Sequence, residues 1–175
     1  MTLIITRATP EEVSEAARLL ADTMLGFGVA VLGAGDEALE LRALAHWFTA
    51  KGNRFSHEHT HIARVQGELA GLLLCFAGRD AAQLSLACRH SIIKLYGARN
   101  LAKLIWRGMV LGHTREAEKD EFLVAHVAVF DEFRRKGIAT RLLEKAVSLA
   151  TEEGFLKVVL EVEIGNSPAI ECYQR

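Results

Sequence analysis

One stretch of the chain restricts its fold more than any other. EFLVAHVAVF, residues 121–130, is almost wholly apolar, which is typical of a strand buried on both faces. Apolar residues then recur at helical spacing from Ile138 to Ala150, and Gly154 supplies a C-terminal stop. LKVVLEVE, residues 156–163, alternates like a strand. A strand, a helix and a strand in that order predict a right-handed crossover between two parallel strands.

The N-terminal part of the chain predicts a short strand and two helices. Leu3–Thr6 is β-prone. Thr9-Pro10 and the two glutamates after it are typical of a helix start, because a hydroxyl caps the first turn and proline fits there. Glycines at positions 26, 28, 33 and 35 break the chain. We expect Asp36 to cap a second helix that ends at Gly52-Asn53.

The middle of the chain predicts a hairpin followed by helix. HTHIARV and LAGLLLCFA are strand-like runs on either side of Gln66-Gly67-Glu68. Residues 80–118 look mostly helical, with breaks near Gly97 and Gly108, and we interpret them as an amphipathic helical insertion. Attachment to a membrane surface is the weaker alternative, because the basic-amphipathic pattern is faint. With no linker, repeat or low-complexity segment, residues 1–175 are expected to form a single α+β domain.

Composition excludes several classes of protein. The formal net charge of -1 gives no bulk basic field, so we expect no nucleic-acid partner. The N-terminus lacks the features of a signal peptide, and no apolar run approaches the ~20 residues of a membrane span, so we expect no membrane partner. The cysteines are scattered without a CxxC pair, which is typical of reduced core residues in a cytoplasmic protein: Cys75, Cys88 and Cys172.

A basic segment stands where the predicted helix after residue 130 begins. FRRKGIATR, residues 133–141, places three cations before Gly137, although a helix N-terminus is already positive. The first N–H groups of a helix have no internal partner and form a ready anion site, and Gly137 has no side chain to block a ligand. Arg134, Arg135 and Lys136 add charge around this turn, and the small Ala139 keeps it open. A pyrophosphate would suit such a turn. The alternative is a surface loop with solvated arginines.

At this point the sequence resembles the GNAT superfamily of N-acetyltransferases. The family signature is a buried strand, then [Gln/Arg]-x-x-Gly-x-[Gly/Ala], then a helix, and HVAVFDEFRRKGIATRLLEKAV follows it. NSPAIECY, with Asn166, Ala169 and Tyr173, matches the later Asn-x-x-Ala-x-x-x-Tyr helix. The resemblance covers the last third of the chain and includes ribosomal-protein alanine acetyltransferases. It implies a mixed, mostly antiparallel sheet with a splayed parallel pair, flanked by helices. Family members continue with closing strands, which we expect to be missing from this sequence.

The resemblance also implies how acetyl-CoA would bind. The strand 121–129 would carry a bulge that begins the splay. The backbone of Val127, Ala128 and Val129 would lie along the pantetheine arm, with Val127 and Val129 pairing with it as though it were a strand. Asn166 would also hydrogen-bond this arm. The backbone N–H groups of the turn would hold the pyrophosphate, from these residues: Arg135, Lys136, Gly137, Ile138, Ala139 and Thr140, with Arg134 beside them.

Acetyl transfer to an amine needs a base, an oxyanion donor and an acid for the thiolate. Tyr173 stands where the family places the acid; otherwise it would be a tyrosine packed on the sheet. Two residues of one strand compete for the role of base. Glu121 matches a catalytic glutamate of the ribosomal-protein enzymes, and His126 lies nearer the expected acetyl position. Each has an ordinary alternative, a solvated strand-start glutamate or a hydrogen-bonded core histidine. The backbone N–H of Val127 is the expected oxyanion donor.

Three histidines before the hairpin raise the question of a metal. In a strand His57, His59 and His61 would share one face, but zinc needs a fourth ligand and none is identifiable. We therefore expect no metal, and the histidines would instead touch the acceptor.

The acceptor itself stays open. It could be a protein N-terminus, a lysine, an antibiotic, a polyamine or a small metabolite, and a net charge near zero does not choose among them. A binding module for acyl-CoA, or a partner-binding domain of the same fold, is the rival function. Dimers are frequent in the family, so a homodimer also stays open.

Overall fold

The computed structural model describes residues 2–24, 27–96 and 117–162. Its centre is an open five-stranded sheet in which the strands follow chain order. The strands are β1 (Leu3–Arg7), β2 (Thr60–Val65), β3 (Glu68–Ala77), β4 (Phe122–Val129) and β5 (Val158–Leu160). Neighbouring strands are antiparallel except β4 and β5, which are parallel. The predicted mixed, mostly antiparallel sheet is thus confirmed.

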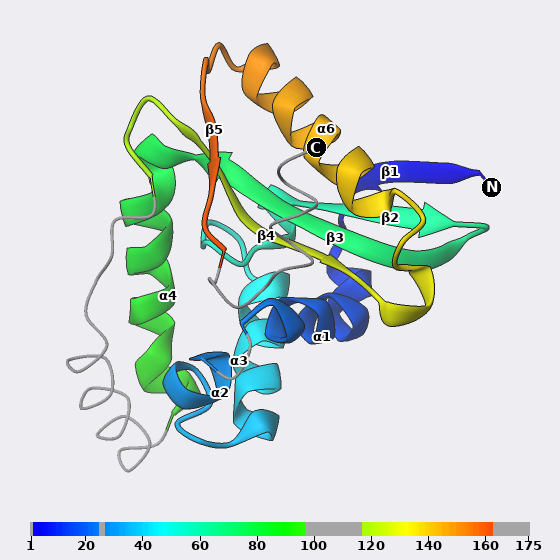
Figure 1. Cartoon of the computed structure of the whole chain (residues 1–175). Helices are drawn as coiled ribbons and strands as arrows, with labels where there is room; N and C mark the ends of the chain where they lie inside the picture. The colour runs from blue at the N-terminus through cyan, green and yellow to red at the C-terminus, as the bar shows by residue number, and fades with distance from the viewer. Residues whose placement is uncertain (1, 25–26, 97–116, 163–175) are drawn as a thin grey trace.

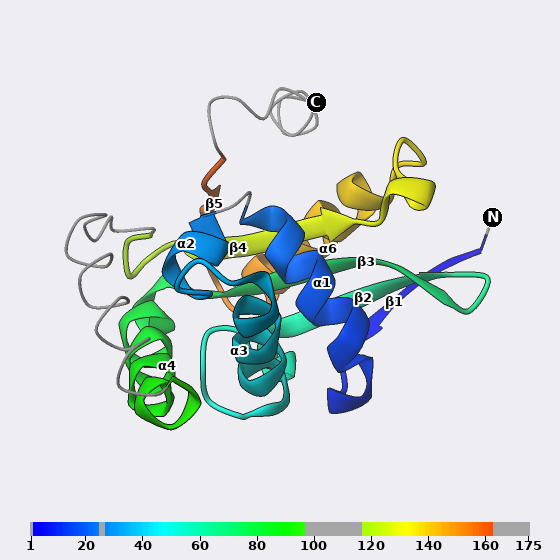
Figure 2. The same cartoon turned by 90° about the horizontal axis from the view of Figure 1, so that it is seen from below.

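Helices cover both faces of this sheet (Figure 1). The α-helices are α1 (Val13–Thr23), α2 (Phe27–Val31), α3 (Glu37–Thr49), α4 (Ala81–Leu95) and α6 (Ile138–Glu152). The short 3-10 turns are η1 (Pro10–Glu12), η2 (His57–His59), η3 (Gly78–Asp80) and η4 (Asp131–Phe133). Seen from below, α1 and α3 lie in front of the strands (Figure 2), while α6 lies on the opposite face. We call these two sides the α1 face and the α6 face.

Each face has its own apolar core. On the α1 face, α3 contributes Trp47 and Phe48, which pack with Leu72 and Leu74 of β3. The Trp47 ring stacks on Phe55 at 5.5 Å, and its Nε1 donates to Ser91 Oγ at 2.6 Å. This large side chain is therefore buried while its one polar group has a hydrogen-bond partner.

On the α6 face, α6 turns one stripe toward the sheet: Ile138, Leu142, Ala146 and Ala150. A spacing of four residues keeps side chains on one face of a helix, and this is the pattern from which the sequence predicted the helix. The stripe packs against β3 and β4 side chains such as Leu73, Phe122 and Val124. Burial of the stripe fixes where the N-terminus of α6 lies relative to the end of β4.

The predicted helix starts are confirmed. The Glu12 carboxylate accepts from the backbone N–H and the hydroxyl of Thr9, at 2.7 and 2.6 Å. Asp36 Oδ1 accepts from the N–H groups of Ala38 and Leu39 at the head of α3. The glycine-rich stretch before Asp36 was expected to interrupt regular structure, but the short helix α2 forms within it.

Other predictions are confirmed only in part. The expected helical insertion over 80–118 begins as α4 and ends at Leu95, and residues 97–116 lie outside the described residues. The strand expected over 156–163 was predicted too long, since pairing with β4 reaches only Leu160. The final helix, with Asn166 and Tyr173, also lies outside the described residues. In the described ranges, no helix combines the length and apolar character that a membrane span requires.

The cap of α3 gives a first prediction. Asp36→Ala removes the acceptor of two orphan helix N–H groups and should lower the free energy of unfolding by about 1 kcal/mol. Asp36→Asn keeps a capping oxygen and should retain most of the stability. Urea denaturation of the three proteins measures the difference; equal losses in both variants would contradict a capping role.

Candidate functional site

A bulge in β4 opens the parallel edge of the sheet. Opposite β3, Leu74 pairs with His126 but Cys75 pairs with Val124, so Ala125 is an extra residue without a partner. The predicted bulge is confirmed. The parallel pairing between β4 and β5 covers Phe122 to Val124 and stops where the bulge begins.

The bulge also decides where the backbone beyond it points. The N–H of Phe122 donates to Lys157 O on the β5 side at 2.8 Å, whereas that of Phe130 donates to Ala70 O on the β3 side at 3.0 Å. In a regular strand, successive N–H groups point to alternate sides. The N–H groups of Phe122 and Phe130 would then point to the same side, since an even number of positions separates them. The extra residue reverses the alternation. The polar backbone groups of Val127 and Val129 therefore face away from β3, along an edge that no described strand pairs.

The same bulge turns His126 to the α1 face, where it meets α1 and the loop before β2. The His126 ring stacks on Phe55 at 5.7 Å, and its Nδ1 lies 2.8 Å from Thr23 Oγ1. The Thr23 hydroxyl donates its only proton to Leu20 O at 2.7 Å, so it must accept from the ring. These contacts assign the neutral Nδ1–H tautomer and leave Nε2 as an acceptor.

Burial lowers the pKa of His126 to about 3, and the positive charge of Arg54 contributes to this shift. The imidazole is therefore neutral throughout the physiological pH range. It can accept a hydrogen bond at Nε2 at any such pH, but it is a weak base toward an ammonium group.

Glu121 lies at the other end of the strand, before the bulge. Its Oε2 accepts from the N–H of Glu118 at 2.8 Å, and its Oε1 is 3.9 Å from Lys157 Nζ. The side chain is 16% exposed. These contacts hold the turn that leads into β4, so the two residues predicted as candidate bases serve different parts of the fold.

The glycine turn joins β4 to α6 through η4. Gly137 is in the left-handed region with φ 76°, and Arg135 has φ 59°. A Cβ built on Gly137 would meet no atom within 4 Å, so the space in front of the turn is open. Intrahelical bonding begins with Arg141 N–H donating to Gly137 O at 3.1 Å. The N–H groups of Ile138 and Ala139 precede that bond and have no intrahelical acceptor.

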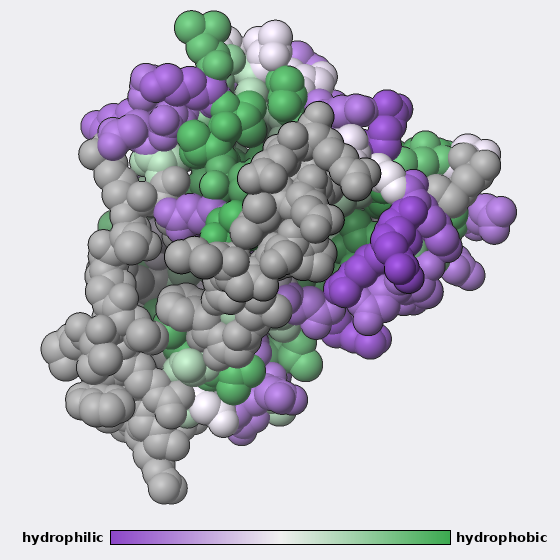
Figure 3. Space-filling view, viewed as in Figure 1, coloured by the Kyte–Doolittle hydropathy of each residue, from purple (hydrophilic) through white to green (hydrophobic). Residues whose placement is uncertain are grey.

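The cations of the turn are held mostly by their own neighbours. Arg134 pairs with Asp131 at 2.8 Å, and its Nε donates to Val129 O at 3.0 Å. Lys136 Nζ donates to Glu132 O at 2.8 Å and lies over the Phe133 ring. Arg135 is exposed and has no hydrogen bond or ion pair with any residue that the structure describes. Figure 3 shows hydrophilic residues gathered over this loop, on the right of the view.

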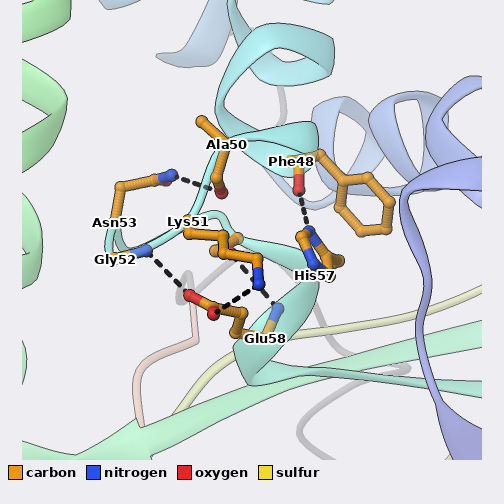
Figure 4. A network of polar contacts seen from close by, with 8 residues as sticks. Phe48, Ala50, Lys51, Gly52, Asn53, His57 and Glu58 are labelled. Carbon is orange, nitrogen blue, oxygen red and sulfur yellow. Dashed lines mark hydrogen bonds and ion pairs between the residues drawn. The ribbon is translucent and has the colours of Figure 1, made fainter.

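The three histidines that raised the question of a metal do not share a strand face. His57 and His59 belong to η2, and only His61 lies in β2. His57 Nδ1 bonds to Phe48 O at 2.8 Å, while Glu58 ties the loop to Gly52 and Lys51 (Figure 4). His57 therefore fixes the end of α3. Among the described residues, no three metal-ligating side chains gather closely enough to hold an ion.

Some residues of the site were missed by the sequence analysis. Thr23 orients His126, and Phe55 covers its ring, yet they come from α1 and from the loop after α3. Neither residue belongs to a motif. Only the packing of α1 and α3 on the α1 face brings them to β4.

An open mixed sheet whose parallel pair separates beside a glycine-headed helix is the architecture of an acetyltransferase. An N-acetyltransferase from Staphylococcus aureus Mu50 has this fold, with a TM-score of 0.72 and 21% identity over 98% of this chain and 87% of that one. The chain belongs to the acetyltransferase (GNAT) family, whose sequence profile matches residues 32–175. The family predicted from the glycine turn is thus confirmed.

Two further relatives differ in what they share with the chain. An N-alpha-acetyltransferase of Saccharolobus solfataricus is 43% identical over 53 residues, which are 30% of this chain and 32% of that protein. The match thus spans about a third of that curated relative. An aminoglycoside N-acetyltransferase in complex with CoA has a TM-score of 0.56 at 11% identity, covering 99% of this chain and 85% of that one. The second likeness shows the fold alone.

Buried histidines give a prediction for stability. Burial lowers the pKa of His61 to about 4 and that of His126 to about 3, against about 6.5 in the unfolded chain. The unfolded state therefore binds these protons at higher pH than the folded state. Stability is fully present above about pH 6.5 and falls as the pH drops toward the folded values, by at most about 1.4 kcal/mol per pH unit for each histidine.

Urea unfolding at about pH 7.5 and about pH 5.5 measures this loss. His61→Gln should reduce the loss, because it removes one of the histidines whose pKa burial lowers. His46→Gln, at an exposed position of α3, is the matched control. A loss identical in His61→Gln and in the unsubstituted protein would show that His61 does not contribute.

Proposed function

We propose that this chain is an acetyl-CoA-dependent N-acetyltransferase that acts on a primary amine by direct attack in a ternary complex. One observation carries the proposal: beyond the bulge no described strand pairs with the outer edge of β4, and this edge leads directly into the open glycine turn at the head of α6. An edge strand offers pairing to an extended amide-bearing chain, and a helix N-terminus attracts phosphate. A molecule with a pantetheine arm and a pyrophosphate has both features in this order.

The residues present fit acetyl-CoA, which supplies the thioester whose acetyl group is transferred. The backbone of Val127 and Val129 would hold the pantetheine arm, along with Ala128 between them and Asn166. The turn from Arg135 to Thr140 would hold the pyrophosphate, because the space in front of Gly137 is open and its surroundings are positive. Arg134 now donates to Val129 O, so it would have to release that carbonyl. A second positive side chain would then be available at the turn.

Atoms balance simply in the reaction that we propose. The amine nitrogen forms a bond to the acetyl carbon, the carbon–sulfur bond breaks, and the proton of the amine ends on the thiolate. The N–H of Val127, on the open edge just past the bulge, would donate to the carbonyl oxygen as its charge develops. Tyr173 would give its proton to the thiolate and regain the one that the amine nitrogen releases.

For the amine, we propose His126 as the contact and Glu121 as a support of the loop. His126 Nε2 is an acceptor at every physiological pH and would orient the N–H of the incoming amine. Because the low pKa of His126 makes it a weak base, the first proton of an ammonium would leave through water. Glu121 is already occupied by Glu118 and Lys157.

Replacement of Gly137 tests the binding half of the proposal. Gly137→Leu should abolish acetyl-CoA binding, since the side chain would enter the open space in front of the turn. Gly154→Leu is a matched control at the other end of α6, with φ 81° and equally open surroundings. Both variants carry the same backbone strain, so both should lose similar stability. Calorimetry with acetyl-CoA separates them; tight binding by Gly137→Leu would refute this account of the turn.

Paired substitutions on β4 test the chemistry. His126→Leu should lower kcat about 10²-fold with acetyl-CoA binding retained, whereas Glu121→Gln should change kcat only slightly. Thiol release with a panel of amines is the assay, and it also separates an enzyme from a module that binds without turnover. The profile of kcat against pH should show no inflection near 6.5, because His126 does not titrate there. A large loss in Glu121→Gln alone would transfer the role of base to Glu121.

A further inference from the structure

A groove lies beside the end of β4. It has a volume of about 580 Å³ and is bounded by α1, α2, α3 and the Phe130–Glu132 segment. Five carboxylates and one guanidinium line it: Asp22, Glu37, Glu40, Asp131, Glu132 and Arg18. The net charge of the chain, which is close to zero, conceals this local excess of negative charge.

Most of these carboxylates pair with no cation among the described residues. Asp131 pairs with Arg134 at 2.8 Å. Arg18 lies over the Phe130 ring at 5.9 Å. Asp22, Glu37 and Glu132 form no ion pair within the ranges that the structure describes. The groove therefore presents a negative potential to solvent, which its low-dielectric walls focus.

Glu40 distinguishes this groove from an ordinary solvated acidic surface. It is only 3% exposed, lines the groove, and its carboxylate has no hydrogen bond or ion pair with any described residue. The backbone of α2 packs directly against it, since a Cβ on Gly28 would lie 1.8 Å from Glu40 Oε1. Burial raises the pKa of Glu40, and the charges of Glu37 and Asp22 raise it further. A largely enclosed carboxylate without a described partner is costly, and a cation in the groove would relieve that cost.

The groove adjoins the site already described. Asp22 precedes Thr23, the residue that holds His126, and Phe130 follows the open edge of β4. An acceptor that places one amino group near His126 could extend its remaining atoms over α1 into the groove. The volume is that of a small-molecule site rather than of a protein interface.

We propose that this groove binds the second ammonium group of a linear polyamine acceptor. The assignment of the polyamine as acceptor rests on the proposed acetyl transfer, but its binding to the groove does not. A polyamine carries amino groups separated by flexible apolar links, so one can lie uncharged at His126 while another pairs with Glu40 and Asp22. A monoamine, or a peptide N-terminus without basic residues, would leave these carboxylates unpaired.

Binding can be tested without turnover. Calorimetry with spermidine alone should show binding, and pentylamine, which has a single amino group, should bind at least about tenfold more weakly. Glu40→Gln and Asp22→Asn should each weaken spermidine binding about tenfold and leave acetyl-CoA binding unchanged. Glu68→Gln, an exposed carboxylate at the start of β3, is the matched control. Thermal unfolding of Glu40→Gln should show a fold at least as stable, because a buried unpaired charge is removed.

The outcomes distinguish this proposal from the proposed function. Spermidine binding that depends on Glu40 supports the groove even if no acetyl group is transferred. If the unsubstituted protein does not bind acetyl-CoA, the proposed acetyltransferase activity is refuted, while the proposal that the groove binds a polyamine still stands. Equal affinity for spermidine and pentylamine, or normal spermidine binding by Glu40→Gln, would overturn the groove proposal. Tighter binding of a lysine-rich peptide than of spermidine would overturn it as well, in favour of a protein acceptor.

Discussion

The extra residue at Ala125 is the constraint on which the rest of the site depends. A regular β4 would turn His126 toward α6. The bulge ends the parallel ladder, directs the polar backbone of Val127 and Val129 to an open edge, and aims His126 at α1. One inserted residue thus separates a structural half of the strand from a half that is free to bind.

Unpaired edge groups and buried unpaired polar groups both reduce stability, and the described part of this chain has both near one end of β4. The two apolar cores support them. The α6 stripe secures the start of α6 beside the end of β4, and the Trp47–Phe55 stack secures the wall behind His126. The stable parts of the fold therefore surround a site that local interactions alone would not maintain.

The charges of the chain are separated rather than balanced locally. Three cations surround the turn at Gly137, and a group of carboxylates lines the groove between α1 and α3. The segment Asp131–Glu132 belongs to both regions, because it lines the groove and also holds Arg134 and Lys136. An anionic and a cationic molecule would therefore be attracted to adjacent sides of the same loop.

The sequence by itself determined the family, the succession of strands and helices along the chain, both helix caps and the glycine turn, because each depends on residues close together in the chain. The apolar run before Gly137 and the stripe from Ile138 to Ala150 already specify a strand and a helix packed on it. Only the tertiary structure decided what His126, Glu121 and Glu40 contact. Their partners come from α1, α2 and the segments that flank β4, and no spacing within the sequence encodes those contacts. The acidic groove could not be read from the sequence for the same physical reason: its carboxylates lie far apart in the chain and meet only when α1 and α3 pack beside the end of β4.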